Sequence, residues 1–308
     1  MPRHLDATDI ILVQMMLSNS RAPAVEISDF LRTTPEEIER RISSLKELGV
    51  LRAFVTRYHP SYLSSSGVLT YGRAEVTTLE EAITKLSKND ATSWVGLGSG
   101  GRLYAGATLR RLSHLDSYLA FLRDEVGIQD LVFGIRSGPP DLQRQRIGIT
   151  ELDKRILRCM HHDSRKSAHE VASEIREERS TVEERIRKLT EEKIVEFSAV
   201  LSPEACSDIL CMFHIFRKGN ARLRDFMRDK LNQHSPNIMF FNTYRNLPDL
   251  VMAMAWSADM AELREIKASL EEGEGVERVE ANVILGSRVV ESWADALIED
   301  PSSKGDRK

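Results

Sequence analysis

The chain has 308 residues, of which 41% are hydrophobic and 29% charged, and its formal net charge is -4. This balance is ordinary for a soluble globular protein of about two to four domains. The negative net charge excludes nucleic-acid binding that rests on a globally basic surface, so any such binding must be local.

The cysteines and the apolar runs bear on the compartment. Cys159, Cys206 and Cys211 are scattered without zinc-ligand spacing, so we expect reduced thiols, no metal site and no cofactor. No apolar run reaches the roughly 18 residues that a membrane span needs. Residues 1–9 also lack the apolar centre of a signal peptide. We therefore expect a cytoplasmic protein without a membrane partner.

Three short helices are predicted near the N-terminus. Residues 5–17 carry apolar side chains at helical spacing, and Pro23 marks the start of a second helix. Thr34 is a candidate N-cap for a third helix, with Pro35 at its first position. Three helices with a tight turn between the second and third outline a helix-turn-helix. Alternating apolar residues at 50–58 then suit a wing strand.

The next segment changes in texture. Strands are predicted at 68–76, 93–97, 102–109 and 128–135, and helices at 79–88 and 112–125. The order βαββαβ is that of a ferredoxin-like domain.

The order of elements then repeats, and the helix-turn-helix segments, from Arg21 and from Arg165 onward, align without a gap at an offset of 144 residues, so that Ile42 falls on Ile186. In the second repeat Ser167 and Glu170 form a capping box for the second helix. Ser180 and Glu183 form another, two residues later than the aligned cap, which predicts a later start for the third helix. The ferredoxin-like strands recur at 209–216, 238–243, 250–256 and 276–285, and the helices at 221–233 and 260–271. A last helix is expected on the stripe Val289, Val290, Trp293 and Leu297.

The predicted fold class is α+β, with two winged helix-turn-helix domains alternating with two ferredoxin-like (RAM-type) domains. We place the domains at 1–64, 65–136, 149–206 and 207–298, the last with the C-terminal helix. Residues 137–148 are a predicted linker and 299–308 a predicted disordered tail.

This order of domains resembles the Lrp/AsnC family of regulators. The run Leu5-Asp6-Ala7-Thr8-Asp9 is similar to the family's opening, and further matching positions occur in both repeats: Arg21, Glu26, Arg41, Leu45, Asp153, Arg165, Glu170, Arg185 and Leu189. The resemblance implies that the first domain binds DNA. It also implies that the second pairs subunits and binds an amino acid or other small effector. The chain departs from the family in carrying two modules, and in the glycine turn before the third strand.

The third helices are the candidate DNA readers, because such helices present their N-terminal side chains to base edges and their cations to phosphates. The candidate residues are Thr34, Glu36, Glu37, Arg40, Arg41 and Ser44 in the first repeat, and Arg179, Ser180, Thr181, Glu184, Arg185, Arg187 and Lys188 in the second. Glutamates at the start of the first of these helices repel phosphates. We therefore expect two unequal heads, the second supplying more of the electrostatic affinity.

A small-effector pocket is the other candidate site. It rests on Gly98, Gly100 and Gly101, and on Tyr244 and Asp249 in the matching turn of the second repeat. The alternative for the glycines is a loose hairpin turn. They are not a P-loop, because no Lys-Ser/Thr follows them.

The sequence thus predicts a sequence-specific DNA-binding transcription regulator in which one chain acts as a pseudo-dimer. Its expected partners are double-stranded DNA, a small effector and further copies of itself. No catalytic constellation stands out, so we expect no enzyme activity. Two alternatives stay open: a ligand sensor that has lost DNA binding, and an enzyme similar to siroheme decarboxylases, which would use His114, Arg110, Arg111, His214 and Arg217.

Overall fold

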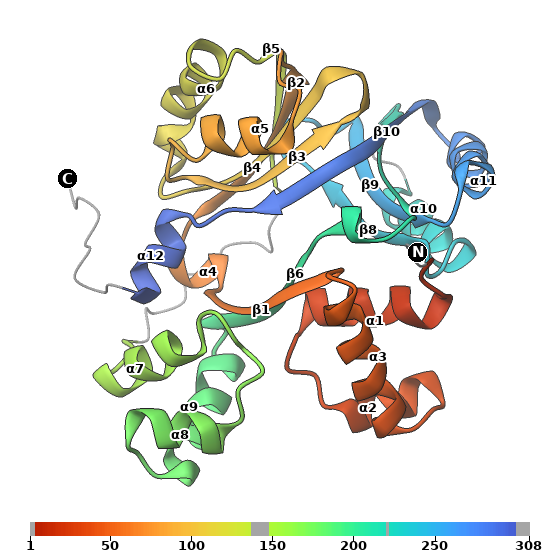
Figure 1. Cartoon of the computed structure of the whole chain (residues 1–308). Coiled ribbons are helices and arrows are strands. Elements are labelled where there is room, and N and C mark those ends of the chain that lie inside the picture. The colour runs from red at the N-terminus through yellow and green to blue at the C-terminus, as the bar shows by residue number, and fades with distance from the viewer. Residues whose placement is uncertain (1–3, 137–147, 220–221, 300–308) are drawn as a thin grey trace.

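The computed structural model describes residues 4–136, 148–219 and 222–299 (Figure 1). Apart from Gly148 and Glu299, the predicted linker and tail lie outside these residues. The two helix-turn-helix domains, called head 1 and head 2 below, pack against a pair of strands, on the side of that pair that faces away from a large sheet (Figure 1). The elements of head 1 are α1 (Ala7–Ser18), α2 (Ala24–Leu31), α3 (Pro35–Glu47) and β1 (Leu51–Tyr58). Those of head 2 are α7 (Glu151–Met160), α8 (Ala168–Ile175), α9 (Arg179–Glu191) and β6 (Val195–Leu201).

Local side-chain caps start most of these helices as the sequence predicts. The Thr34 side chain accepts from the amide of Glu37 at the start of α3, and Ser167 and Glu170 form the capping box of α8. The prediction of a later start for the third helix of head 2 is wrong. Helix α9 begins at Arg179, in register with α3, and its N-cap Glu178 makes no side-chain bond.

The remaining strands form one sheet in the order β5-β2-β4-β3-β10-β7-β9-β8. Each half has the strand order of a ferredoxin-like domain, which confirms the predicted α+β fold. The first half comprises β2 (Ser66–Arg73), α5 (Leu79–Leu86), β3 (Thr92–Gly98), β4 (Arg102–Leu109), α6 (Leu115–Asp124) and β5 (Gln129–Ile135). The second comprises β7 (Ile209–Arg217), α10 (Leu223–Gln233), β8 (Ile238–Thr243), β9 (Leu250–Ser257), α11 (Met260–Glu271) and β10 (Val276–Val289). Short helical turns lie at α4 (Pro60–Leu63), Ser99–Gly101, Leu112–His114 and Pro203–Ala205.

The two halves are joined at both ends. Strand β10 pairs with β7 up to Ile284 and then with β3 up to Val289. At the opposite end Arg136, just after β5, pairs with Tyr244, just after β8. The inner faces of the two halves therefore face one another and share a core that contains Tyr71, Tyr104, Met212, Met252 and Trp256. The outer faces pack separately against α5 and α6, and against α10 and α11 (Figure 1).

Corresponding strands of the two repeats meet at the centre of this sandwich. The strand registers place Tyr71 of β2 opposite Tyr104 in one half and His214 of β7 opposite Met252 in the other. The ring centroids of Tyr71 and His214 lie 4.4 Å apart, and the Tyr104 hydroxyl lies 3.0 Å from His214 Nε2. Burial, with a smaller contribution from Arg102, lowers the pKa of His214 to about 3, so this imidazole is neutral.

Strands β1 and β6 form the hinge between the heads and the sheet, and each head rests on the strand of the other. The Ser198 hydroxyl of β6 donates to the Leu17 carbonyl of α1 at 2.8 Å. The Thr56 hydroxyl of β1 donates to the Met160 carbonyl of α7 at 2.9 Å. Each head therefore packs on its own strand and is also bonded to the strand of the other head.

The heads also touch one another through an inter-head clasp of Ser20, Arg21, Ser164 and Arg165. The hydroxyls of Ser20 and Ser164, counterparts at an offset of 144, are fully buried and lie 2.6 Å apart. Arg21 donates to the carbonyls of Ser164 and Lys166, and Arg165 donates to the carbonyl of Ser20. This reciprocal bonding fixes the position of one head relative to the other.

The C-terminal helix differs from its prediction. Strand β10 continues to Val289, and helix α12 (Trp293–Glu299) begins only after it, because Val289 pairs with Trp94 of β3. The Trp293 indole donates to the Thr108 carbonyl at 2.6 Å, and Asp295 pairs with Arg57 of β1 at 3.0 Å. Helix α12 thereby ties the hinge to the first half of the sheet. Within the described ranges, every helix is too short or too polar to cross a membrane.

The clasp gives a stability prediction. Ser20→Ala leaves the Ser164 hydroxyl buried without its partner, so we expect the free energy of unfolding to fall by about 1–3 kcal/mol. The double variant Ser20→Ala, Ser164→Ala removes both polar groups and should lose no more than either single variant. Urea unfolding followed by circular dichroism measures both, with the exposed Ser43→Ala as control. Single variants as stable as the parent chain would show that the hydroxyl pair contributes nothing.

Candidate nucleic-acid interface and cavity

The third helices bury one face and expose the other. Ile38, Ile42 and Leu45 of α3 are buried in head 1, and Val182 and Leu189 of α9 in head 2. The opposite faces carry the charged side chains, as a helix that lies on a DNA groove requires.

Arg41 and Arg185 do not belong to these exposed faces. Arg41 binds Asp9 at 2.7 Å and Arg185 binds Asp153 at 2.5 Å, and the two aspartates are 2% and 0% exposed. Burial acts to raise the pKa of Asp153, but Arg185 and Thr150 outweigh it and hold the pKa below its usual value. We therefore correct the DNA-contact prediction for these two arginines. They tie the third helix of each head to the first.

Helix α9 keeps its other cations at the surface. The side chains of Arg179, Arg187 and Lys188 are 66%, 64% and 46% exposed, each beside a glutamate four residues along. Exposed pairs of this kind contribute about 0.3–0.5 kcal/mol, so a phosphate can displace the glutamate at small cost. Ser180 and Glu184 are exposed on the same helix and Thr181 is half-buried.

Helix α3 is more acidic. Arg40 is exposed and held by Glu37, and this contact lowers the pKa of Glu37 to about 2. Glu36 is exposed, Ser44 is half-buried, and the Thr34 side chain is engaged as the cap of the helix. Helix α3 thus contains more acidic residues than α9, four glutamates against three, and the inequality of the two heads stays a prediction.

Sequence reasoning missed a further pair of arginines. Arg32 and Arg176 are counterparts at the ends of α2 and α8, both left-handed in backbone (φ 54° and 55°) and both exposed. Their backbone amides donate to Ser28 and Ala172 as helix C-caps, and among the described residues neither guanidinium makes a hydrogen bond or ion pair. Each occupies the turn before the third helix, where a cation can reach a phosphate. The sequence did carry a signal for this pair, because Arg32 and Arg176 are 144 residues apart and so occupy matching positions in the two repeats.

The predicted effector residues do not come together. Gly98, Gly100 and Gly101 form the turn between β3 and β4, and Gly100 and Gly101 have positive φ, as a tight turn requires. Asp249 accepts from the amide of Gly219 in another turn. Tyr244 alone lies at a cavity.

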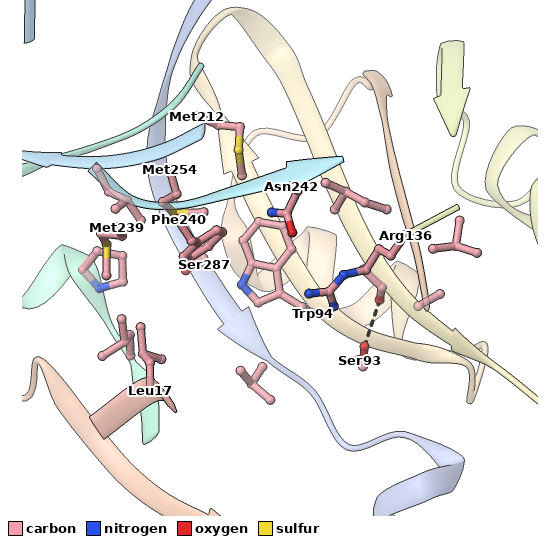
Figure 2. A pocket seen from close by; sticks show the side chains of 18 of the residues that line it. Leu17, Ser93, Trp94, Arg136, Met212, Met239, Phe240, Asn242, Met254 and Ser287 are labelled. Carbon is pink, nitrogen blue, oxygen red and sulfur yellow. Dashed lines mark hydrogen bonds between the residues drawn. The ribbon is translucent and has the colours of Figure 1, made fainter. Parts of the chain in front are cut away.

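That cavity has a volume of about 270 Å³ and lies between the two inner sheet faces and the hinge. Its walls are mainly apolar, with Trp94, Met212, Phe240 and Met254 among them (Figure 2). Arg136 carries the only charge among the described residues that line it.

Two further groups of residues have defined places. His161, His162 and Glu299 bring ligand-type atoms within 4.8 Å of one another at the joint of head 2 and α12. The residues named for a decarboxylase are dispersed: His214 lies in the shared core, Arg217 stacks on Phe226, and Arg110 binds Asp90.

Comparisons with known proteins match the second head most clearly. Residues 149–190 match the AsnC-type helix-turn-helix domain family. Over 52 residues the chain is 46% identical to an uncharacterised helix-turn-helix-type transcriptional regulator of Pyrococcus horikoshii. It is 44% identical to another from Pyrococcus abyssi over the same length. Each match covers 17% of this chain and 35% of the relative, so the chain spans about a third of the curated relatives it matches.

A likeness over the whole chain comes from solved structures of the siroheme decarboxylase NirDL. One covers 96% of this chain and 97% of NirDL at 12% identity, with a TM-score of 0.60. A second, with an iron-uroporphyrin III analogue, covers 97% and 98% at 14% identity, with a TM-score of 0.59. At this identity the likeness shows a shared fold. It overturns the expectation that the chain is not an enzyme, because a decarboxylase has this arrangement over nearly its whole length.

The two kinds of arginine on α9 give a paired prediction. Arg185→Met leaves Asp153 buried without its cation, so we expect the free energy of unfolding to fall by about 3 kcal/mol. Arg187→Met removes an exposed pair and should change stability by about 0.5 kcal/mol or less. Chemical unfolding at neutral pH distinguishes them.

The pH dependence of the Arg185→Met deficit is a further check. Because the folded pKa of Asp153 is lowered, its pair with Arg185 contributes above the unfolded pKa and is lost as the pH falls through the folded pKa. The deficit of the variant should therefore shrink in acid. Equal stability losses in Arg185→Met and Arg187→Met would contradict the structural role of Arg185.

Proposed function

We propose that the chain is a DNA-binding transcription regulator, starting from the AsnC-type helix-turn-helix domain at residues 149–190. The observation that carries the proposal is the exposed face of α9, where Arg179, Arg187 and Lys188 stand at the surface while Arg185 alone is turned inward. The negative net charge of the chain makes such a local basic face necessary for DNA binding.

The two heads act as one unit in this proposal, so that a single chain serves as a pseudo-dimer. The inter-head clasp and the paired hinge strands support it, because both hold α3 and α9 in a fixed relation. Two recognition helices at a fixed separation select a fixed spacing of half-sites along the duplex.

The heads are proposed to read unequal half-sites. Head 2 offers three exposed cations on its third helix, and head 1 offers two, Arg40 beside the acidic Glu36 and Glu37, and Lys46 in the last turn. Head 2 then supplies more of the salt-dependent affinity. Assembly of several chains and response to a small effector stay predictions within this proposal.

A second candidate function is a tetrapyrrole-modifying enzyme, favoured by the whole-chain likeness to NirDL. The cavity of 270 Å³ is below the roughly 300 Å³ at which pockets for drug-sized ligands begin, and a tetrapyrrole is larger. A Soret band after incubation with iron uroporphyrin III would favour this candidate.

DNA binding is tested with a duplex selected from a random pool, by fluorescence anisotropy across a salt series. We expect the double variant Arg187→Gln, Lys188→Gln to bind more weakly, with a salt slope reduced by about 2, since each lost phosphate contact removes about 0.9. Arg40→Gln in head 1 should reduce the slope by about 1 or less.

The matched control is Arg228→Gln, Arg264→Gln, which removes two exposed cations from α10 and α11, outside the heads. It should bind DNA like the parent chain. If the pool yields no enriched sequence, and the parent chain and both double variants bind equally weakly, the chain is not a sequence-specific regulator.

A further inference from the structure

The cavity between the sheets lies where two rows of cross-strand neighbours, one from each half, face each other. In the first half, Leu69 pairs with Gly106, and Gly106 with Trp94. In the second half, Met212 pairs with Met254, and Met254 with Phe240. The cavity therefore lies between corresponding strands of the two repeats.

Two glycines keep this site empty of side chains. Gly106 is the middle residue of the row in the first half, and Met254 is the middle residue of the row in the second half. The row of the first half therefore has no side chain at its centre. The Trp94 ring lies across Gly96, where a Cβ would stand 2.5 Å from its Cη2 atom. The indole thus lies flat against its own sheet and forms a wall of the cavity.

The charged group of the site lies at its mouth. Arg136 is exposed overall and lies at the mouth, and its guanidinium points toward Trp94 and the amide of Asn242 (Figure 2). Its backbone amide is bonded to Gly67, and among the described residues the guanidinium makes no hydrogen bond or ion pair. Glu196 on β6 is the acid within its electrostatic reach, and burial raises the pKa of that carboxyl. The register at the matching end of the second half places Ile284 opposite Leu210, so no second arginine faces Arg136.

The site also touches the joint between head 1 and the hinge. Leu17 in the last turn of α1, and Ala199 and Leu201 of β6, line the same cavity. The Leu17 carbonyl accepts a hydrogen bond from the hydroxyl of Ser198, which precedes Ala199 on β6. A molecule in the cavity is therefore in contact with the surface on which head 1 rests.

We propose that this cavity binds a small monocarboxylate with an apolar or aromatic body, whose carboxylate is held by Arg136. The planar guanidinium matches a carboxylate through two parallel hydrogen bonds, and the aromatic and thioether walls bury the body. The ligand adjusts DNA affinity through Leu17 and β6. This last step rests on the proposed function, whereas binding of the ligand does not.

The binding test uses the full chain without DNA. The probes are 3-phenylpropionate and octanoate, each compared with its primary amide, by calorimetry and by tryptophan fluorescence, since Trp94 lines the site. We expect both carboxylates to bind about tenfold more tightly than their amides. Arg136→Met should remove this preference and leave amide binding unchanged.

The control Arg123→Met removes an exposed arginine on α6 and should bind like the parent chain. A second variant, Gly96→Ala, drives the indole into the cavity and should weaken both carboxylates and amides, with folding checked by circular dichroism. No heat and no fluorescence change with either probe would overturn the assignment, as would equal binding by Arg136→Met. Displacement of the probes by iron uroporphyrin III would overturn it in favour of a tetrapyrrole site.

The regulatory step is measured separately, as the affinity for the selected duplex with and without saturating 3-phenylpropionate. A shift that is absent in Arg136→Met supports the coupling, and an unchanged affinity overturns it. If the chain binds the carboxylate but no duplex, the proposed function fails and the assignment of the cavity stands.

Discussion

The double pairing of strand β10 holds the two repeats together. One strand completes the second ferredoxin-like half through β7 and then hydrogen-bonds to β3 of the first half. Because the main-chain bonds are satisfied on both sides, the two inner faces are held against each other and bury a common core. The cavity, the contact between the Tyr71 and His214 rings, and the position of the hinge all depend on this closure. The heads follow, since each rests on the hinge strand of the other repeat.

The parts that the sequence predicts well are those set by neighbouring residues. Thr34 before a proline and Ser167 before a glutamate start helices because the capping bonds are local. The alternation of strands and helices follows from the periodicity of buried residues. Local signals fail where packing competes: Ser180 and Glu183 form a plausible box. Val182 and Leu189 are buried at the positions that match Ile38 and Leu45 of α3. Helix α9 nevertheless begins at Arg179, before the predicted cap, since packing of this apolar face contributes more to a helix than a local cap.

The sites are harder to predict because they depend on residues far apart in the chain. Arg185 and Arg187 are both basic positions of one helix, and only the buried Asp153, 32 residues away, separates their roles. The cavity requires the registers of four strands, and in particular that Gly106 and Met254 hold matching places. The sequence draws attention to Gly98, Gly100 and Gly101, but these glycines form a hairpin turn. Arg136 lines the cavity, and no motif around it in the sequence indicates a binding site.

The contact between Tyr71 and His214 has a consequence for how such a chain can change over time. When two identical subunits meet at a twofold axis, a substitution at the axis alters both partners at once, and the new residue must tolerate itself. In one continuous chain the two sides of this contact are encoded separately, so a tyrosine ring can pack against an imidazole. In a symmetric dimer the residues at the centre are the most constrained. In this chain the two residues that meet there can be substituted independently, so an asymmetric site can form at the centre.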